Sequence, residues 1–120
     1  MKRILATLLT LIAVAIGVRA DTPAQFPGGE EAMNKFIAEN LQYPPQAKEN
    51  DIEGVVTVSF VVKSDGTIGT IKIARLIDPD LEQEAIRIVK KMPAWIPADK
   101  GGSPAESTAE ISIPFQLPKD

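Results

Sequence analysis

An Asp-Gly pair between two apolar runs restricts the fold of this chain more than any other feature. Residues 55–62 alternate, so that every second side chain is apolar and faces the same way. Asp65-Gly66 is typical of a two-residue β-hairpin turn. Such a turn sets which residues lie opposite each other, and the apolar pairs are Phe60 with Ile71 and Val58 with Ile73. Because these pairs fall on one face, the turn and the pattern predict the same register.

Helical patterns precede and follow the hairpin. Residues 30–41 repeat apolar side chains at the spacing of one helix face, and residues 80–92 do so more strongly. Pro93 ends the second helix because proline cannot continue the hydrogen-bonding pattern. A short helical turn is predicted over residues 46–50. The buried positions expected from the two long helices are Met33, Phe36, Ile37, Leu41, Leu81, Ala85, Ile88 and Met92, with Val89 at the edge of the second stripe.

The last apolar alternation, residues 108–117, predicts a third strand. Pro114 lies within it and has no N–H to donate, so this strand belongs at the edge of a sheet. The chain reverses direction between successive elements, and the last strand can therefore pair antiparallel only with the first. The prediction is an α+β domain with a three-stranded antiparallel sheet of order 2-1-3 and helices packed on one face.

The first twenty residues form a separate segment. Lys2 and Arg3 precede an uncharged, mostly apolar run over residues 4–18, and a small-residue site follows with cleavage between Ala20 and Asp21. This is the layout of a secretory signal peptide. The run is shorter than the roughly 20 apolar residues that span a membrane, but a short N-terminal anchor remains the alternative.

The rest of the chain is predicted to be one domain. Residues 21–29 form an entry arm, and residues 30–117 form the domain itself. Residues 98–107, rich in Gly, Ser and Pro, are expected to be a surface loop.

The charge of the mature chain argues against two classes of partner. The leader carries three basic residues, so its removal changes the net charge from −3 to −6. Nucleic acids and anionic lipids favour a basic patch, and an acidic surface argues against binding to them. We therefore expect no nucleic-acid partner, and contact with a membrane only if the leader stays attached.

The sequence lacks the residues from which most catalytic and metal sites are built. It has no histidine and no cysteine, which removes the usual general base, thiolate nucleophile and zinc ligands. The acidic residues at the start of the second helix match no calcium-loop spacing and suit the positive end of the helix dipole. They are Asp78, Asp80, Glu82 and Glu84. We expect no enzyme activity, no cofactor and no metal site. Trp95 and Tyr43 are interpreted as packing residues, with a partner anchor as the alternative.

Taken in order, the short motifs of this chain resemble the C-terminal domain of TonB-type energy transducers. No single motif is specific, but the ordered set covers essentially all of the mature chain. The motifs are Phe26-Pro27-Gly28-Gly29, Tyr43-Pro44, Ile52-Glu53-Gly54, Asp65-Gly66, Trp95-Ile96-Pro97 and Pro114-Phe115.

The resemblance implies a non-catalytic periplasmic module that binds protein by strand addition. In that family the last strand pairs with a short segment of an outer-membrane receptor, and backbone hydrogen bonds supply affinity. The corresponding residues here are Glu110, Ile111, Ser112, Ile113, Pro114, Phe115 and Gln116. An exposed edge also permits a strand-exchanged homodimer.

Three hypotheses follow for the biological role. The first is an exported periplasmic module, linked to TonB-dependent transport, that docks a receptor or peptide without transducing energy, because the chain lacks a long Pro-rich spacer. The second is a short energy transducer anchored on the periplasmic side of the inner membrane. The third is an accessory or inhibitor domain that uses the same strand edge.

Overall fold

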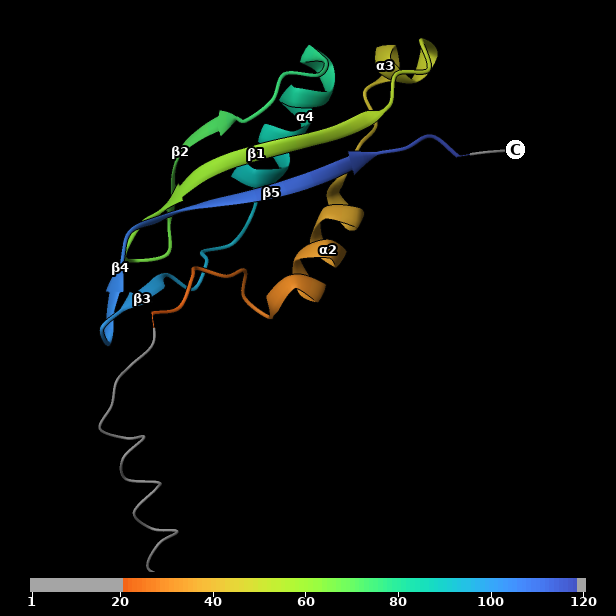
Figure 1. Cartoon of the computed structure of the whole chain (residues 1–120). Coiled ribbons are helices and arrows are strands. Elements are labelled where there is room, and N and C mark those ends of the chain that lie inside the picture. Colours follow the sequence, from red (N-terminus) through yellow and green to blue (C-terminus); the bar gives the residue numbers. More distant parts are fainter. Residues whose placement is uncertain (1–20, 119–120) are drawn as a thin grey trace, which may run out of the picture.

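The computed structural model describes residues 21–118 (Figure 1). The predicted signal peptide or anchor, including Ala20 at the cleavage site, lies outside these residues. No helix within residues 21–118 has the length and apolar character needed to cross a membrane. The elements in chain order are α2 (Gly29–Asn40), α3 (Pro45–Glu49), β1 (Gly54–Val62), β2 (Ile68–Ile73), α4 (Pro79–Lys90), β3 (Ala98–Lys100), β4 (Ser103–Ala105) and β5 (Ser107–Phe115).

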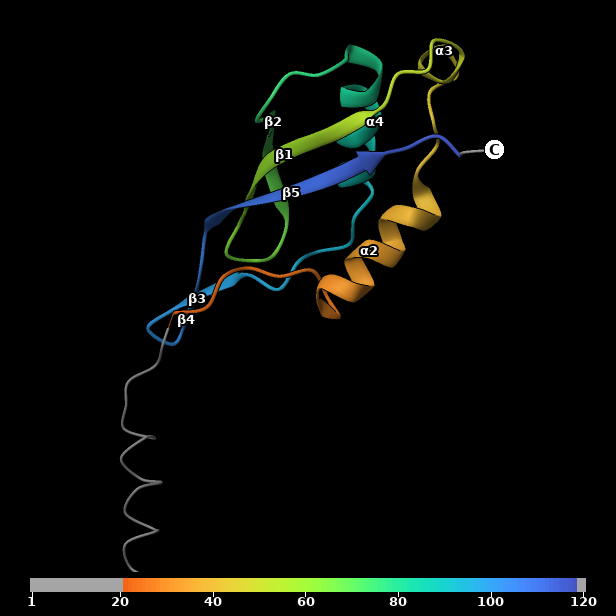
Figure 2. The ribbon, with the colours of Figure 1, turned by 45° about the vertical axis from the view of Figure 1, so that its right-hand side comes forward.

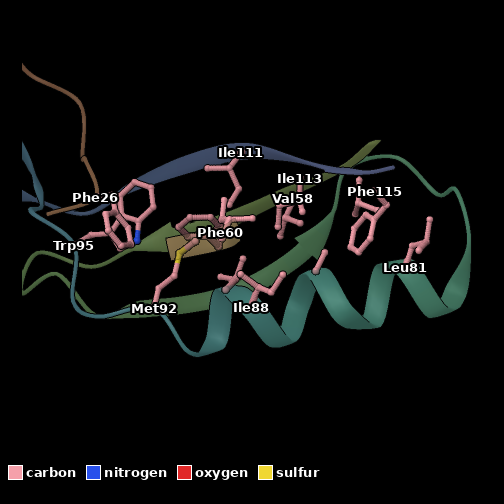
Figure 3. Packing of buried hydrophobic residues seen from close by; sticks show 14 of the residues in the cluster. Phe26, Val58, Phe60, Leu81, Ile88, Met92, Trp95, Ile111, Ile113 and Phe115 are labelled. Carbon is pink, nitrogen blue, oxygen red and sulfur yellow. The ribbon is translucent and has the colours of Figure 1, made fainter. Parts of the chain in front are cut away.

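The main sheet confirms the predicted topology. Its strand order is β2-β1-β5, with both pairings antiparallel and β1 in the centre. The buried side chains of β1 all project toward the face on which α4 packs, while its other face is more exposed. Figure 3 shows Leu81 and Ile88 of α4 beneath side chains of β1 and β5. The fold is therefore an α+β domain in which one face of the sheet carries the core.

The hairpin register was predicted correctly, but the turn is longer than expected. Phe60 lies opposite Ile71 and Val58 opposite Ile73. The Lys63 N–H donates to the Thr67 carbonyl at 2.8 Å, which leaves three residues in the loop, and Gly66 has a φ of 90°. Three-residue loops use a glycine at this left-handed position. A bulge between Ile68 and Ile71 then absorbs the extra residue.

Helix α4 begins and ends at chemically identifiable residues. The Asp78 side chain accepts hydrogen bonds from the backbone N–H groups of Asp80 and Leu81, at 3.0 and 3.1 Å, and so caps the helix N-terminus. The helix ends at Lys90 rather than at Met92 as predicted, because Pro93 prevents the following turn from being helical. Met92 nevertheless stays in the core, and Val89 is fully buried rather than marginal.

The predicted surface loop over residues 98–107 is wrong, because most of it forms a hairpin. Strands β3 and β4 pair antiparallel across Gly101 and Gly102, whose positive φ angles of 61° and 95° suit a tight turn. The entry arm pairs with β3 from the other side, since Thr22 and Asp99 exchange backbone hydrogen bonds of 2.9 and 3.0 Å. Figure 2 shows this small sheet extending from one end of the main sheet.

Aromatic packing joins the entry arm to the sheet. Phe26 and Phe60 contact Trp95 edge to face, with ring centroids 6.0 and 5.2 Å apart (Figure 3). Trp95 is 6% exposed, which agrees with its interpretation as a packing residue. Tyr43 packs edge to face on Phe115 and donates a hydrogen bond to the Ile52 carbonyl. Burial is the largest cause that raises the pKa of Tyr43 above its ordinary value, and the nearby Glu53 and Asp78 add to it.

A half-buried ion pair ties the end of α2 to α4, which charge placement alone did not predict. Glu84 is 8% exposed and accepts two 2.7 Å hydrogen bonds from Arg87 and a third from the Gln42 backbone N–H. Arg87 also donates to the Asn40 carbonyl at 2.7 Å. Burial alone would raise the pKa of Glu84, but the hydrogen bonds from Arg87 and Gln42 and the charges of Arg87 and Lys91 outweigh it. The pKa therefore lies below its ordinary value.

We expect Glu84→Gln to destabilise the domain by about 1–3 kcal/mol at pH 7, because Arg87 loses its counter-charge and an amide NH2 replaces one of the two oxygens that accept from Arg87. A carboxyl whose folded-state pKa is depressed contributes stability above its unfolded pKa of about 4.3 and loses it as the pH falls through the folded value. The deficit should therefore shrink below about pH 5. Urea unfolding of the wild type and the variant at pH 7 and pH 3.5 measures this difference in the free energy of unfolding, and Glu39→Gln at an exposed position is the control. A deficit that does not change with pH would contradict the ionic contribution.

Candidate functional site

Strand β5 has one free edge. Its other edge pairs with β1 over nine residue pairs, from Gly54 opposite Phe115 to Val62 opposite Ser107. No strand among residues 21–118 pairs with its outer side, because the main sheet ends there. An edge strand presents unpaired backbone donors and acceptors to any extended segment that lies beside it.

The hydrogen-bonding pattern identifies which backbone groups of β5 face outward. The Ala74 N–H donates to the Thr57 carbonyl at 2.9 Å, so the backbone polar groups of Thr57 point toward β2. These groups alternate along an antiparallel strand, and those of Val56, Val58 and Phe60 therefore point toward β5. On β5 the partners of these three residues are bonded to β1. The intervening residues of β5, which are Thr108, Glu110, Ser112 and Pro114, direct their polar backbone groups to the free edge.

The predicted site residues within β5 consequently fall into two sets, and one further residue lies beyond the strand. Ile111, Ile113 and Phe115 are buried, because their side chains enter the core and their backbone groups bond to β1. Glu110, Ser112 and Pro114 are exposed and carry the outward backbone groups, with three carbonyls but only two N–H donors. Gln116 is exposed and lies just beyond the end of β5.

Helix α2 forms a wall beside this edge. In both Figure 1 and Figure 2, β5 is the strand of the main sheet that lies beside α2. Two hollows of about 410 and 390 Å³ follow the strand between them. The first, here called the arm hollow, is lined among others by Phe26, Glu30, Met33, Ala109, Glu110 and Ile111. The second, the helix hollow, is lined among others by Ile37, Ala38, Leu41, Ser112, Pro114 and Gln116.

The free edge of β5 together with these two hollows is named the edge groove. Its floor and its α2 wall are mostly apolar, while exposed carboxylates stand at one end. Within the described part of the chain, no three acidic side chains gather as a metal site would require.

The contribution of α2 to this site did not follow from the sequence pattern. The pattern predicted the helix, but it does not give the position of a helix relative to a particular strand edge. The Gly28-Gly29 turn is the only local signal, since φ angles of 92° and 86° let the chain reverse directly after Phe26 enters the core. This reversal places the first turn of α2 beside the arm hollow.

Comparison with known proteins identifies the fold and the family. Residues 39–117 match the model of the Gram-negative bacterial TonB protein C-terminal family. No curated protein sequence matches significantly. Two solution NMR structures of the Helicobacter pylori TonB C-terminal domain are similar to this chain, each with a TM-score of 0.55. One is 24% identical and covers 73% of this chain and 79% of its own; the other is 26% identical and covers 77% and 99%.

The matched region includes α3, α4 and every strand, so it contains the free edge of β5. The entry arm and nearly all of α2 precede it. Domains of the matched family are periplasmic in Gram-negative bacteria, interact with proteins such as receptors, and are linked to TonB-dependent transport. The chain belongs to the family of TonB protein C-terminal domains.

Proposed function

We propose that this chain is a non-catalytic periplasmic module that docks an outer-membrane receptor, or a similar peptide segment, by strand addition at β5. The observation that carries the proposal is the outward direction of the polar backbone groups of Glu110 and Ser112 on an otherwise unpaired edge. A strand laid beside β5 would satisfy these groups and extend the sheet from three strands to four.

The position of Pro114 supports this use of the edge. Proline lacks an N–H. Because the backbone nitrogen of Pro114 faces the free edge, the hydrogen bonds between β5 and β1 are intact. A bound strand can therefore form a regular ladder beside Glu110 and Ser112 but must lose one bond at Pro114. We place the bound segment mainly alongside residues 108–112, with its end near Pro114.

The same domain could act with the leader either removed or retained. If the leader is removed between Ala20 and Asp21, the domain is free in the periplasm. If it is retained, the domain is held at the periplasmic side of the inner membrane as a short transducer. The favoured arrangement is the free module, because the uncharged run of residues 4–18 is short for a membrane span of roughly 20 residues.

Ser112→Pro tests the site directly. It removes an outward donor and should weaken partner binding at least about tenfold, since one hydrogen bond and the ladder geometry beside it are lost. Ser112→Ala is the matched control, because it removes the side chain but keeps the N–H, and we expect it to bind like the wild type. Affinity capture from an envelope fraction, followed by identification of the captured receptor, measures both.

Equal capture by the wild type and Ser112→Pro would show that the partner does not use the β5 edge. Capture that depends on Ser112 but returns only a soluble enzyme would favour the accessory or inhibitor role. A second copy of the chain as the captured species would instead indicate pairing of two β5 edges in a homodimer.

A further inference from the structure

We infer that the segment bound in the edge groove carries a lysine or arginine beside apolar residues. This inference rests on the proposed function, since it describes the chemistry of the strand that β5 would receive. It comes from the charges at one end of the groove and from the apolar walls along the rest of it.

Two acidic residues border the path of an added strand at the arm hollow, and their side chains lie toward opposite faces of the sheet. Glu30 lies in the first turn of α2, and Glu110 lies on β5; both line this hollow. Glu110 is opposite Ser59 of β1, so its side chain lies on the open face of the sheet, whereas α2 packs against the core. Successive side chains of a strand point to opposite faces. A basic residue at this end of the added strand can thus approach Glu110 or Glu30, depending on its position.

Neither carboxylate forms an ion pair within residues 21–118; on the open face, Lys72 of β2 lies in the same row as Glu110 but is separated from it by Ser59 of β1. Neither hollow is lined by a lysine or arginine of residues 21–118. The only ion pair within these residues is that of Glu84 with Arg87, which lies on α4. Glu30 also suits the positive end of the α2 dipole, so Glu110, which has no such role, is the clearer residue to test.

The apolar walls define what accompanies the basic residue. Met33 and Phe26 line the arm hollow, and Ile37, Ala38 and Leu41 line the helix hollow. Side chains of an added strand that point toward α2 meet these surfaces, so burying Val, Ile or Leu there is favourable. The strand advances about 3.4 Å per residue, and a segment of about eight residues would reach along both hollows.

Four peptides test this inference by fluorescence anisotropy. Each has eight residues of alternating Val and Thr with blocked termini, and each carries a Lys or a Glu at either its first or its last position. We expect the better Lys peptide to bind roughly two- to fivefold more tightly than its Glu counterpart at low salt. The preference should diminish at 0.5 M salt because the carboxylates are exposed.

Variants of the protein separate this inference from the proposed function. Glu110→Gln should reduce the preference and Glu110→Lys should reverse it, while Glu49→Gln, which makes the same charge change on α3, should leave it unchanged. Equal binding of Lys and Glu peptides that is still lost in Ser112→Pro would overturn this inference alone. Peptide binding that Ser112→Pro does not affect would overturn the proposed site. Failure of all four peptides to bind would also overturn the inference.

Discussion

Ala109→Pro is expected to unfold much of the domain, whereas Ser112→Pro, three residues further along β5, should leave it folded. Ala109 lies opposite Phe60 at the centre of the sheet, and its backbone groups point toward β1. Proline there removes an internal donor, leaves a Phe60 acceptor unpaired and forces extra atoms against the core. We expect a loss on the order of 3–5 kcal/mol, a large part of the stability of a domain this size.

Ser112 differs from Ala109 in the direction of its backbone groups and in its side chain, which is exposed whereas that of Ala109 packs against the core. Its N–H faces outward, and its hydroxyl makes one exposed contact with Thr57 at 3.2 Å. We expect Ser112→Pro to cost less than about 1 kcal/mol. Thermal unfolding followed by circular dichroism should therefore show a melting temperature that is lower by at least about 12 °C for Ala109→Pro and by only a few degrees for Ser112→Pro. Similar falls for both variants would mean that the assignment of inward and outward groups is wrong.

The topology of the main sheet was predictable because its signals are local and have a fixed period. The alternation in residues 55–62, the Asp65-Gly66 pair and the proline at residue 114 each restrict one pairing, and together they leave one strand order. The length of the turn was not predictable in this way. A three-residue loop with a compensating bulge gives the same pairing of Phe60 with Ile71 as a two-residue loop without one.

The features that the sequence did not reveal depend on contacts between distant residues. The hairpin of β3 and β4 has only three residue pairs and a composition typical of loops, and it is stabilised partly by the entry arm more than 70 residues earlier. Glu84 was interpreted as a helix-start charge, yet its partners include Gln42 from another part of the chain. The position of α2 beside β5 could not be predicted either, because core packing sets where the helix lies relative to this strand.

Gly66→Ala is predicted to destabilise the domain by more than left-handed backbone strain alone. Gly66 is buried with a φ of 90°, and a Cβ built there would lie 2.2 Å from the Trp95 carbonyl oxygen. The Trp95 N–H also donates to the Gly66 carbonyl at 2.8 Å, so the turn cannot move away without breaking this bond. Left-handed strain of about 1–2 kcal/mol adds to the loss of a buried hydrogen bond worth about 1–3 kcal/mol.

Gly101→Ala is the matched control, because Gly101 also has a positive φ, 61°, but a Cβ there meets no atom within 4 Å. It should cost only the strain of about 1–2 kcal/mol. Urea unfolding of both variants then isolates the contact between the hairpin turn and Trp95, and Trp95 fluorescence should change in the folded state of Gly66→Ala alone. If the two variants lose equal stability, the turn and Trp95 do not pack as closely as the structure shows.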